Sequence, residues 1–330
     1  MIDFRYHLVS IIAVFLALAV GLVVGSTALS GKAEEALSAA QHKALADNAA
    51  LTKERDQLRQ QVAGDQAFAA AGAGRLLNGL LTGERVVLVA APGADSAVLS
   101  GVTTALRQAG ATVTGQVSLT SAFTATSGQN EAVLSQLAQS LAAKAGLALT
   151  ADPGSLVAGQ QAAAQVLAAS LVSASASLTS SASEEILAGF SQNGYVSVDS
   201  GAPAAAPAEL AVLVTPGGPP PQSASGVLVA VAQELKSAGS VTVMAGAASS
   251  IGTGSAISAE NSAGNVVSTV DDADTPIGQI LVVQALRYLL DGKPPAAYGA
   301  QPAAAPSPAP VPGAISTPKP SATPTVKSHA

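Results

Sequence analysis

The sequence contains no cysteine among its 330 residues, and this absence excludes several kinds of site at once. Without thiols the chain forms no disulfide, no thiolate metal centre and no zinc ribbon, and it has no cysteine nucleophile. We therefore expect its stability to come from ordinary side-chain packing.

Aromatic residues are also scarce, at 3% of the chain, whereas hydrophobic residues make up 48%. Ala, Val and Leu recur throughout, which indicates a core of small aliphatic side chains packed closely together. The length suffices for one sizeable domain with appendages. Basic residues are few, because only 15 Lys and Arg are scattered along a chain of net charge -6. They form no basic stripe, which disfavours nucleic acid as a partner.

The residues needed for nucleophilic catalysis are missing as well. There is no G-x-S-x-G motif, and the three histidines lie far apart in the sequence, at His7, His42 and His329. None falls in the central part of the chain, where a serine nucleophile would need its base. The sequence therefore predicts a protein that is not an enzyme and has no catalytic residues.

What the chain does have is a long apolar run at its N-terminus, residues 8–29, within an uncharged stretch that extends to Gly31. As a helix this run measures about 33 Å, which matches the hydrocarbon thickness of a bilayer. Arg5 and the free amino group outweigh Asp3, which places the short stub before the run in the cytoplasm and the bulk of the chain outside it. We predict a cytoplasmic stub and transmembrane anchor over residues 1–31, with the lipid bilayer as partner.

A cleaved signal peptide is the alternative, because the small residues after Val24 resemble a cleavage site. The run is longer than a typical secretory apolar region, which favours an uncleaved anchor. Gly21 and Gly25 form a G-x-x-x-G pair that would let two anchors pack closely, although small residues are common in membrane helices in any case.

The next segment, residues 32–67, is the most charged part of the chain and carries a seven-residue repeat. Its d positions are Leu37, Ala44, Leu51 and Leu58, and its a positions are Gln41, Asn48, Arg55 and Val62. This pattern predicts a short coiled-coil stalk and a homo-oligomer, in which Asn48 sets the register of a parallel dimer. A solitary amphipathic helix packed on the following domain is the alternative.

A small-residue linker over 68–83 then leads into an α/β domain over 84–299. ERVVLVAAPG and ATVTGQVSL are typical of buried parallel strands, and the segment between them is typical of a helix. Asp95 fits the N-cap of that helix and Gly110 fits its C-terminal stop.

The same alternation continues to the end of the domain. Helices are expected over 130–146, 160–173 and 226–238, and Ser181 with Glu184 forms a capping box before another. Strands are expected at YVSV, Glu209–Thr215, SVTVMAGA and NVVSTV, and a last helix at ILVVQALRYLLDG. We predict an open, mainly parallel, Rossmann-like sheet with helices.

Two loop features are candidate ligand sites. Gly252 and Gly254 form an isolated G-x-G without the third glycine of a dinucleotide fingerprint, which favours a flexible loop. Asp271, Asp272 and Asp274 would suit a hard cation, but the glycine and glutamate of a calcium loop are absent.

A structural role explains the acidic cluster more economically. Thr275 fits a helix N-cap and Pro276 the first helical position, where acidic neighbours complement the helix dipole. We predict no metal or cofactor site. The remaining residues, 300–330, are dominated by Pro, Ala, Ser and Thr and are expected to form an extended, disordered tail.

The opening MIDFRYHLVSIIAVFLALAVGLVVGSTAL closely resembles the start of the actinobacterial MctB-like family, named for copper transport at the outer membrane. The closing VSTVDDADTPIGQILVVQAL and Tyr298-Gly299 are similar to that family too. The resemblance implies a role in copper homeostasis, with copper as the transported ion.

The side chains give that role little direct support. Copper(I) favours Cys and Met, and copper(II) favours imidazole, whereas this chain has dispersed histidines and two methionines, Met1 and Met244. Met244 lies in an apolar strand pattern, where we expect it in the core. Two functions therefore stay open: an oligomeric envelope component of copper efflux or tolerance, and an envelope scaffold that binds other envelope proteins. A solute- or nucleotide-binding enzyme is the weakest alternative.

Overall fold

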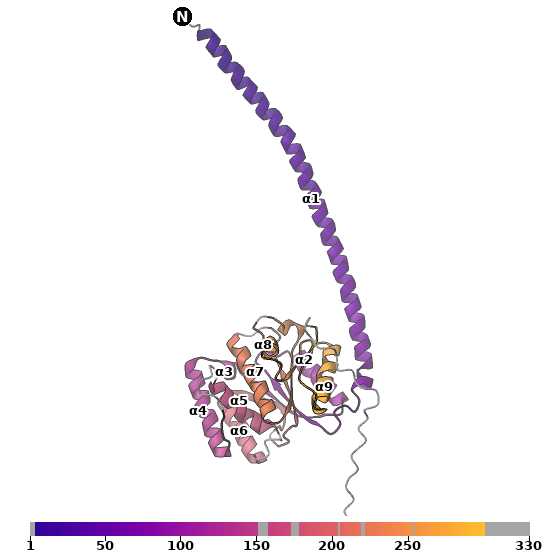
Figure 1. Cartoon of the computed structure of the whole chain (residues 1–330), viewed down its shortest axis with the longest axis vertical. Coiled ribbons are helices and arrows are strands. Elements are labelled where there is room, and N and C mark those ends of the chain that lie inside the picture. The colour runs from indigo at the N-terminus through magenta and orange to yellow at the C-terminus, as the bar shows by residue number, and fades with distance from the viewer. Residues whose placement is uncertain are drawn as a thin grey trace, which may run out of the picture. The chain divides into compact units, whose positions relative to one another are not determined.

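The computed structural model describes residues 4–150, 158–172, 178–203, 205–218, 222–252 and 254–300 (Figure 1). The chain divides into two compact units, Met1–Asp65 and Gln66–Ala330. The predicted tail lies outside the described residues from 301 onward, so its disorder stays a prediction.

The first unit consists of one helix, because α1 (Phe4–Leu77) runs for 74 residues. The helix contains no proline, so no backbone N–H is missing from its hydrogen-bond ladder. Its segment Tyr6–Gly25 has a mean hydropathy of 2.9 and is long and apolar enough to cross a membrane, with none of that segment buried. The predicted membrane segment and stalk are thus consecutive stretches of a single helix.

The last turns of α1 belong to the second unit. Ala69 and Ala73 pack against its core, and Leu77 is fully buried there together with Leu81. Residues 68–83 were expected as a linker on account of their small side chains, but residues 68–77 are helical. Small residues at helical spacing let one helix approach its neighbours closely. Ala69 and Ala73 do this at the end of α1.

The second unit is built on a seven-stranded sheet in the order β3-β2-β1-β4-β5-β6-β7. All pairs are parallel except β2 with β3, which is antiparallel. The strands are β1 (Arg85–Ala90), β2 (Thr112–Leu119), β3 (Val196–Gly201), β4 (Leu210–Val214), β5 (Val241–Ala245), β6 (Ser268–Val270) and β7 (Ala297–Tyr298). The predicted open, mainly parallel sheet is confirmed, and its first six strands follow the doubly wound order of dinucleotide-binding domains.

Helices cover both faces of this sheet. They are α2 (Ser96–Gln108), α3 (Ser121–Thr124), α4 (Gly128–Ala145), α5 (Ala158–Leu171), α6 (Ser180–Gln192), α7 (Gln222–Ser237), α8 (Ala256–Ser262) and α9 (Pro276–Leu290), with a 3-10 turn η1 (Ala248–Ser250). Side chains that alternate along β1 separate two cores. Val87 and Val89 pack with α4, α5, α6 and α7, whereas Val86 and Leu88 pack with α2, α9 and the end of α1.

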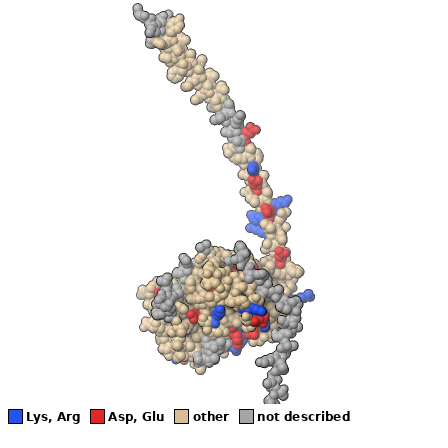
Figure 2. Space-filling view, in the orientation of Figure 1, with Lys and Arg blue, Asp and Glu red and all other residues tan. Residues whose placement is uncertain are grey.

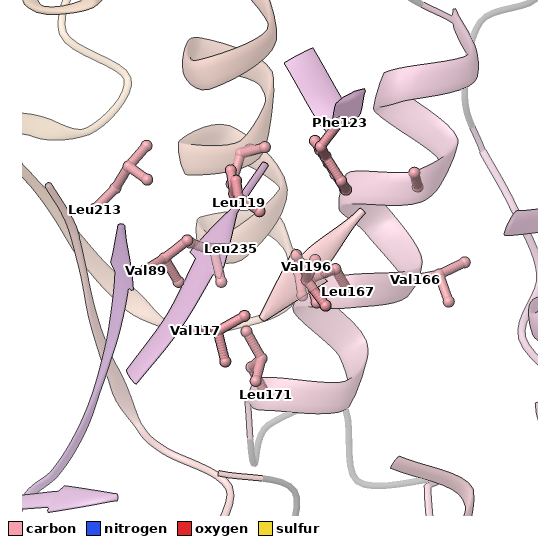
Figure 3. Close-up of a cluster of buried hydrophobic side chains, with 14 of the residues drawn as sticks. Val89, Val117, Leu119, Phe123, Val166, Leu167, Leu171, Val196, Leu213 and Leu235 are labelled. Atoms are coloured by element: carbon pink, nitrogen blue, oxygen red, sulfur yellow. The ribbon is translucent and has the colours of Figure 1, made fainter. Parts of the chain in front are cut away.

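The first of these cores is the larger and is made of small aliphatic side chains around one aromatic pair. Figure 3 shows strand residues such as Val89 and Val117 meeting Leu167 of α5 and Leu235 of α7. The rings of Phe123 and Phe190 meet edge to face at 6.3 Å between centroids. The predicted aliphatic core is present on both faces of the sheet.

Capping residues and glycines in the sequence predicted most helix ends to within a few residues. Asp95 caps α2 by accepting from the Ala97 N–H at 2.7 Å, and Gly110 follows the helix end in the left-handed region at φ +87. The predicted capping box at Ser181 and Glu184 is wrong. Thr179 caps α6 instead, because its hydroxyl accepts from the Ala182 N–H, so the cap lies two residues before the predicted one.

Strand β3 forms one edge of the sheet and carries a bulge. Gln116 of β2 pairs with Ser200, but the next residue, Val117, pairs with Val198, so Asp199 is an extra residue. Its carboxylate accepts hydrogen bonds from the hydroxyl groups of Ser118 and Ser197. The inserted acidic residue is thereby held against the neighbouring strand.

An ion pair joins the amino ends of β1 and β4. The Arg85 guanidinium and backbone N–H both donate to the Glu209 carboxylate. Burial alone would raise the pKa of Glu209, but the hydrogen bonds and positive charge of Arg85, together with the backbone N–H of Glu209 itself, outweigh burial and hold this pKa below its usual value. This contact links the amino ends of the two central strands, whose backbones pair in parallel from Val86 with Leu210 onward.

If the end of α1 is part of the folded core, Leu77→Ala should lower the free energy of unfolding by about 2–5 kcal/mol. Phe68→Ala is the matched control on the same helix, because Phe68 is 83% exposed; its effect should stay within about 0.5 kcal/mol. Urea unfolding of the detergent-solubilised chain, followed by tyrosine fluorescence, measures both. Equal effects of the two substitutions would show that the last turns of α1 do not contribute to the core.

Candidate functional site

The carboxyl edge of the sheet is the first place to look for a ligand site. In doubly wound sheets ligands bind beyond the strand ends where the strand order reverses, which here lies between β1 and β4. The loops after these two strands are bonded to each other. The Gly217 N–H donates to the Gly93 carbonyl at 3.3 Å, and Ala94 pairs with Pro216 as an antiparallel bridge. The two loops at this switch point are thus joined to each other by main-chain contacts.

The isolated glycine pair lies in the loop between η1 and α8. Gly254 has φ +86, a left-handed conformation that glycine adopts without strain, and its carbonyl accepts from the Ser225 hydroxyl of α7. The described part of this loop is therefore fastened to a neighbouring helix, and residue 253 lies outside the described residues.

The densest group of carboxylates follows β6, at the same edge. Asp271 is buried, and its carboxylate accepts from the Ala300 N–H at 2.7 Å, while its own N–H donates to the Tyr298 carbonyl. A Cβ on Gly299, whose φ is +123, would lie 2.0 Å from that carboxylate oxygen. Asp271 therefore holds the chain after β7, and glycine is required beside it.

Asp272 lies at the start of α9 in a more unusual setting. Its Oδ1 is buried and has no hydrogen-bond partner among the described residues. Burial and the negative charge of Asp271 together raise the pKa of the Asp272 carboxyl to about 6. Glycine at position 278 lets the first turn of α9 lie this close to Asp272. A Cβ at that position would lie only 2.0 Å from the Asp272 carbonyl oxygen.

The remaining acidic residue, Asp274, accepts from the Ala248 N–H at 3.0 Å and so holds the loop after β5. Thr275 caps α9 through the Gly278 N–H at 3.0 Å, and Pro276 begins the helix, as predicted. The carboxylates of Asp271 and Asp274 thus bind different backbone N–H groups, and the buried Oδ1 of Asp272 binds none among the described residues. In the described part of the chain, no three His, Cys, Asp or Glu side chains are grouped so as to hold a metal ion.

The side chains that copper prefers are separated from one another. Met244 is fully buried in β5, within the core, as predicted. His7 and His42 both lie on α1, where 35 helical steps place them about 52 Å apart along the helix. His329 lies outside the described residues.

Sequence reasoning identified the acidic cluster and the cap of α9, but it missed the glycines that the cluster requires. Gly278 and Gly299 stand in the segments that carry the family resemblance, but the sequence predicted no steric role for either, because their close approaches to Asp272 and Asp271 are visible only in the folded chain. The raised pKa of Asp272 was missed for the same reason.

Comparison with known proteins now adds what the geometry does not. The profile of the family described as "Copper transport outer membrane protein, MctB" matches residues 1–308. The chain belongs to the MctB family. Among MctB relatives, the protein named "Copper transporter MctB" from Mycobacterium bovis is 30% identical over 308 residues, which cover 91% of this chain and 96% of the relative. The protein of the same name from Mycobacterium tuberculosis gives the same values.

The match extends across both units and both motifs on which the resemblance was based. In this MctB-family chain the VSTVDDADTPIGQ segment has a structural use that the contacts make explicit. The carboxylates of Asp271 and Asp274 and the threonine cap of Thr275 join β6, α9 and the loops after β5 and β7. The segment therefore holds together the carboxyl edge of the sheet.

The raised pKa of Asp272 predicts a pH-dependent effect of Asp272→Asn. Because the folded state binds this proton more tightly than the unfolded state, ionisation of Asp272 lowers stability as the pH rises through about 6. The asparagine variant should therefore melt a few degrees above the parent at pH 7.5 and should lose that advantage near pH 4. Differential scanning calorimetry of both proteins at the two pH values measures this. An unchanged difference between them would contradict the assignment.

Proposed function

We propose that this chain is a membrane-anchored protein of the cell envelope that acts in copper homeostasis, as an oligomeric component without a catalytic site of its own. The observation that carries this proposal is the family match over residues 1–308, in which named relatives are copper transporters. A transporter name also favours a role other than catalysis. Copper is then the transported ion rather than a resident cofactor.

The N-terminal segment of α1 supports the anchoring. Figure 2 shows a stretch of α1 without charged side chains, followed by a stretch in which acidic and basic side chains alternate. The uncharged stretch contains Tyr6–Gly25, and Arg5 lies just before it. This distribution favours a single crossing near residues 8–29, with the N-terminus in the cytoplasm and the bulk of the chain outside.

The arrangement of side chains favours an indirect role in copper movement. Soft sulfur and imidazole donors are the ligands that copper prefers, and in the described residues they do not converge. We therefore propose that the chain supports copper transport as part of an assembly, with further copies of itself and other envelope proteins as its partners. The exposed leucines of the stalk are the surface for self-association.

A second candidate function, an envelope scaffold with no direct role in copper handling, is favoured by one observation. The stalk exposes Leu37, Leu51 and Leu58, while in the second unit the loops after β1 and β4 are bonded to each other. A scaffold needs the first of these features and does not need a ligand site.

Cell-associated copper separates the two candidates. A strain lacking the gene should accumulate more copper than its parent when both grow across a copper series, and the intact gene should reverse this. Zinc content, measured in the same cells, should not change. Equal copper content and tolerance in the deletion strain and its parent would leave the scaffold function.

The predicted topology can be tested with single cysteines, because the chain has none of its own. Ala46→Cys, on the exposed part of α1, should react in intact cells with a maleimide that does not cross membranes. Ile2→Cys should react only after the membrane is permeabilised. Labelling of Ile2→Cys in intact cells would contradict a cytoplasmic N-terminus.

A further inference from the structure

The middle of the stalk carries an apolar surface without a partner in the described structure. Three large apolar side chains on one side of α1 are exposed, namely Leu51 at 66%, Leu58 at 56% and Val62 at 55%. They line a shallow groove together with Glu54, Arg55 and Arg59. We call these six residues the mid-stalk surface. Its apolar centre and charged borders are the composition of a helix-pairing seam.

The spacing places each member of the mid-stalk surface at a defined heptad position. Leu51 and Leu58 are at d, and Arg55 and Val62 are at a, so that all four lie on one seam. Glu54 then falls at g and Arg59 at e of the following heptad. The borders of the seam therefore carry opposite charges five residues apart.

That separation selects the orientation of a partner. In a parallel, in-register pair, the g residue of one helix meets the e residue of the following heptad on the other helix. Glu54 of each copy then faces Arg59 of the other, twice in each pair. An antiparallel pair brings g to g and e to e, which places like charges opposite each other.

The contacts within one copy leave these groups ready for such a pairing. Glu54 makes no ion pair among the described residues, and Arg59 is 3.9 Å from Asp56. Arg55, at a seam position, donates to Asp56 through Nη2 at 2.9 Å and Nε at 3.1 Å. Its charge is thereby held beside the seam rather than within it, while its methylene groups remain to cover the leucines.

We propose that the mid-stalk surface binds the same surface of a second copy, as a parallel, in-register pair of helices with reciprocal Glu54–Arg59 contacts. This proposal rests on the proposed function in one respect, since anchors in the same membrane give both copies the same direction. Asn48, at the preceding a position, adds a polar layer that matches only when the two copies are in register.

Cysteine cross-linking in native membranes tests the pairing, with diamide as the oxidant so that copper is not added. Leu51→Cys and Leu58→Cys place a thiol on the seam and should give mostly disulfide-linked dimers. Lys53→Cys and Gln60→Cys, each two residues further on and at f positions, are the matched controls and should give at least tenfold less. Equal cross-linking of seam and control positions would overturn the proposal.

Charge exchange tests the orientation. In the Leu58→Cys background, Glu54→Arg or Arg59→Glu alone should reduce the dimer severalfold, because each places like charges opposite each other. The double variant Glu54→Arg/Arg59→Glu should restore it. Failure of the double variant to restore cross-linking would overturn the parallel, in-register arrangement.

Copper content of the same strains keeps this result separate from the proposed function. Loss of the seam-specific dimer in a strain that still controls its copper would overturn the pairing alone. A seam-specific dimer in a protein whose deletion leaves copper unchanged would support the pairing and contradict the copper role.

Discussion

Close packing of small aliphatic side chains on both faces of a parallel sheet is the constraint on which the second unit depends. With no disulfide and one buried aromatic pair in the described residues, stability has to come from many short side chains fitted together. Small side chains also allow close contacts where helices meet their neighbours. Gly159 lets α5 approach the carbonyl of Glu131, and Ala69 and Ala73 let the end of α1 lie against the core. Small residues that look like linkers in the sequence are contacts in the structure.

Much of this fold follows from local patterns. The apolar run of β1, the cap at Asp95 and the stop at Gly110 define a β-α-β unit within a residue or two. Strand β7 could not be predicted from local patterns, because it has two residues and no hydrophobic run of its own. The antiparallel direction of β3 could not be predicted either, since the composition of YVSV is the same in a parallel and in an antiparallel strand. Direction and pairing depend on segments far apart in the chain.

The candidate site divides in the same way. The roles of Thr275 and Pro276 could be predicted from the sequence, because a helix cap and a proline at the first helical position act within one turn. The setting of Asp272 depends instead on Asp271 beside it and on the burial produced by the folded carboxyl edge. The association with copper came neither from local sequence patterns nor from contacts in the folded structure. It rests on likeness over the whole chain, while the composition of the side chains argues for support of transport rather than for tight binding.

The bulge at β3 has a consequence for assembly. In the proposed pairing of stalks, two open sheets would be held at a high effective concentration, which is the condition in which exposed strand edges join. Asp199, inserted into the edge strand and bonded to Ser118, twists that edge and places a charge where a flat neighbouring strand would need regular pairing. The bulged and charged edge of the domain thus disfavours the addition of a further strand.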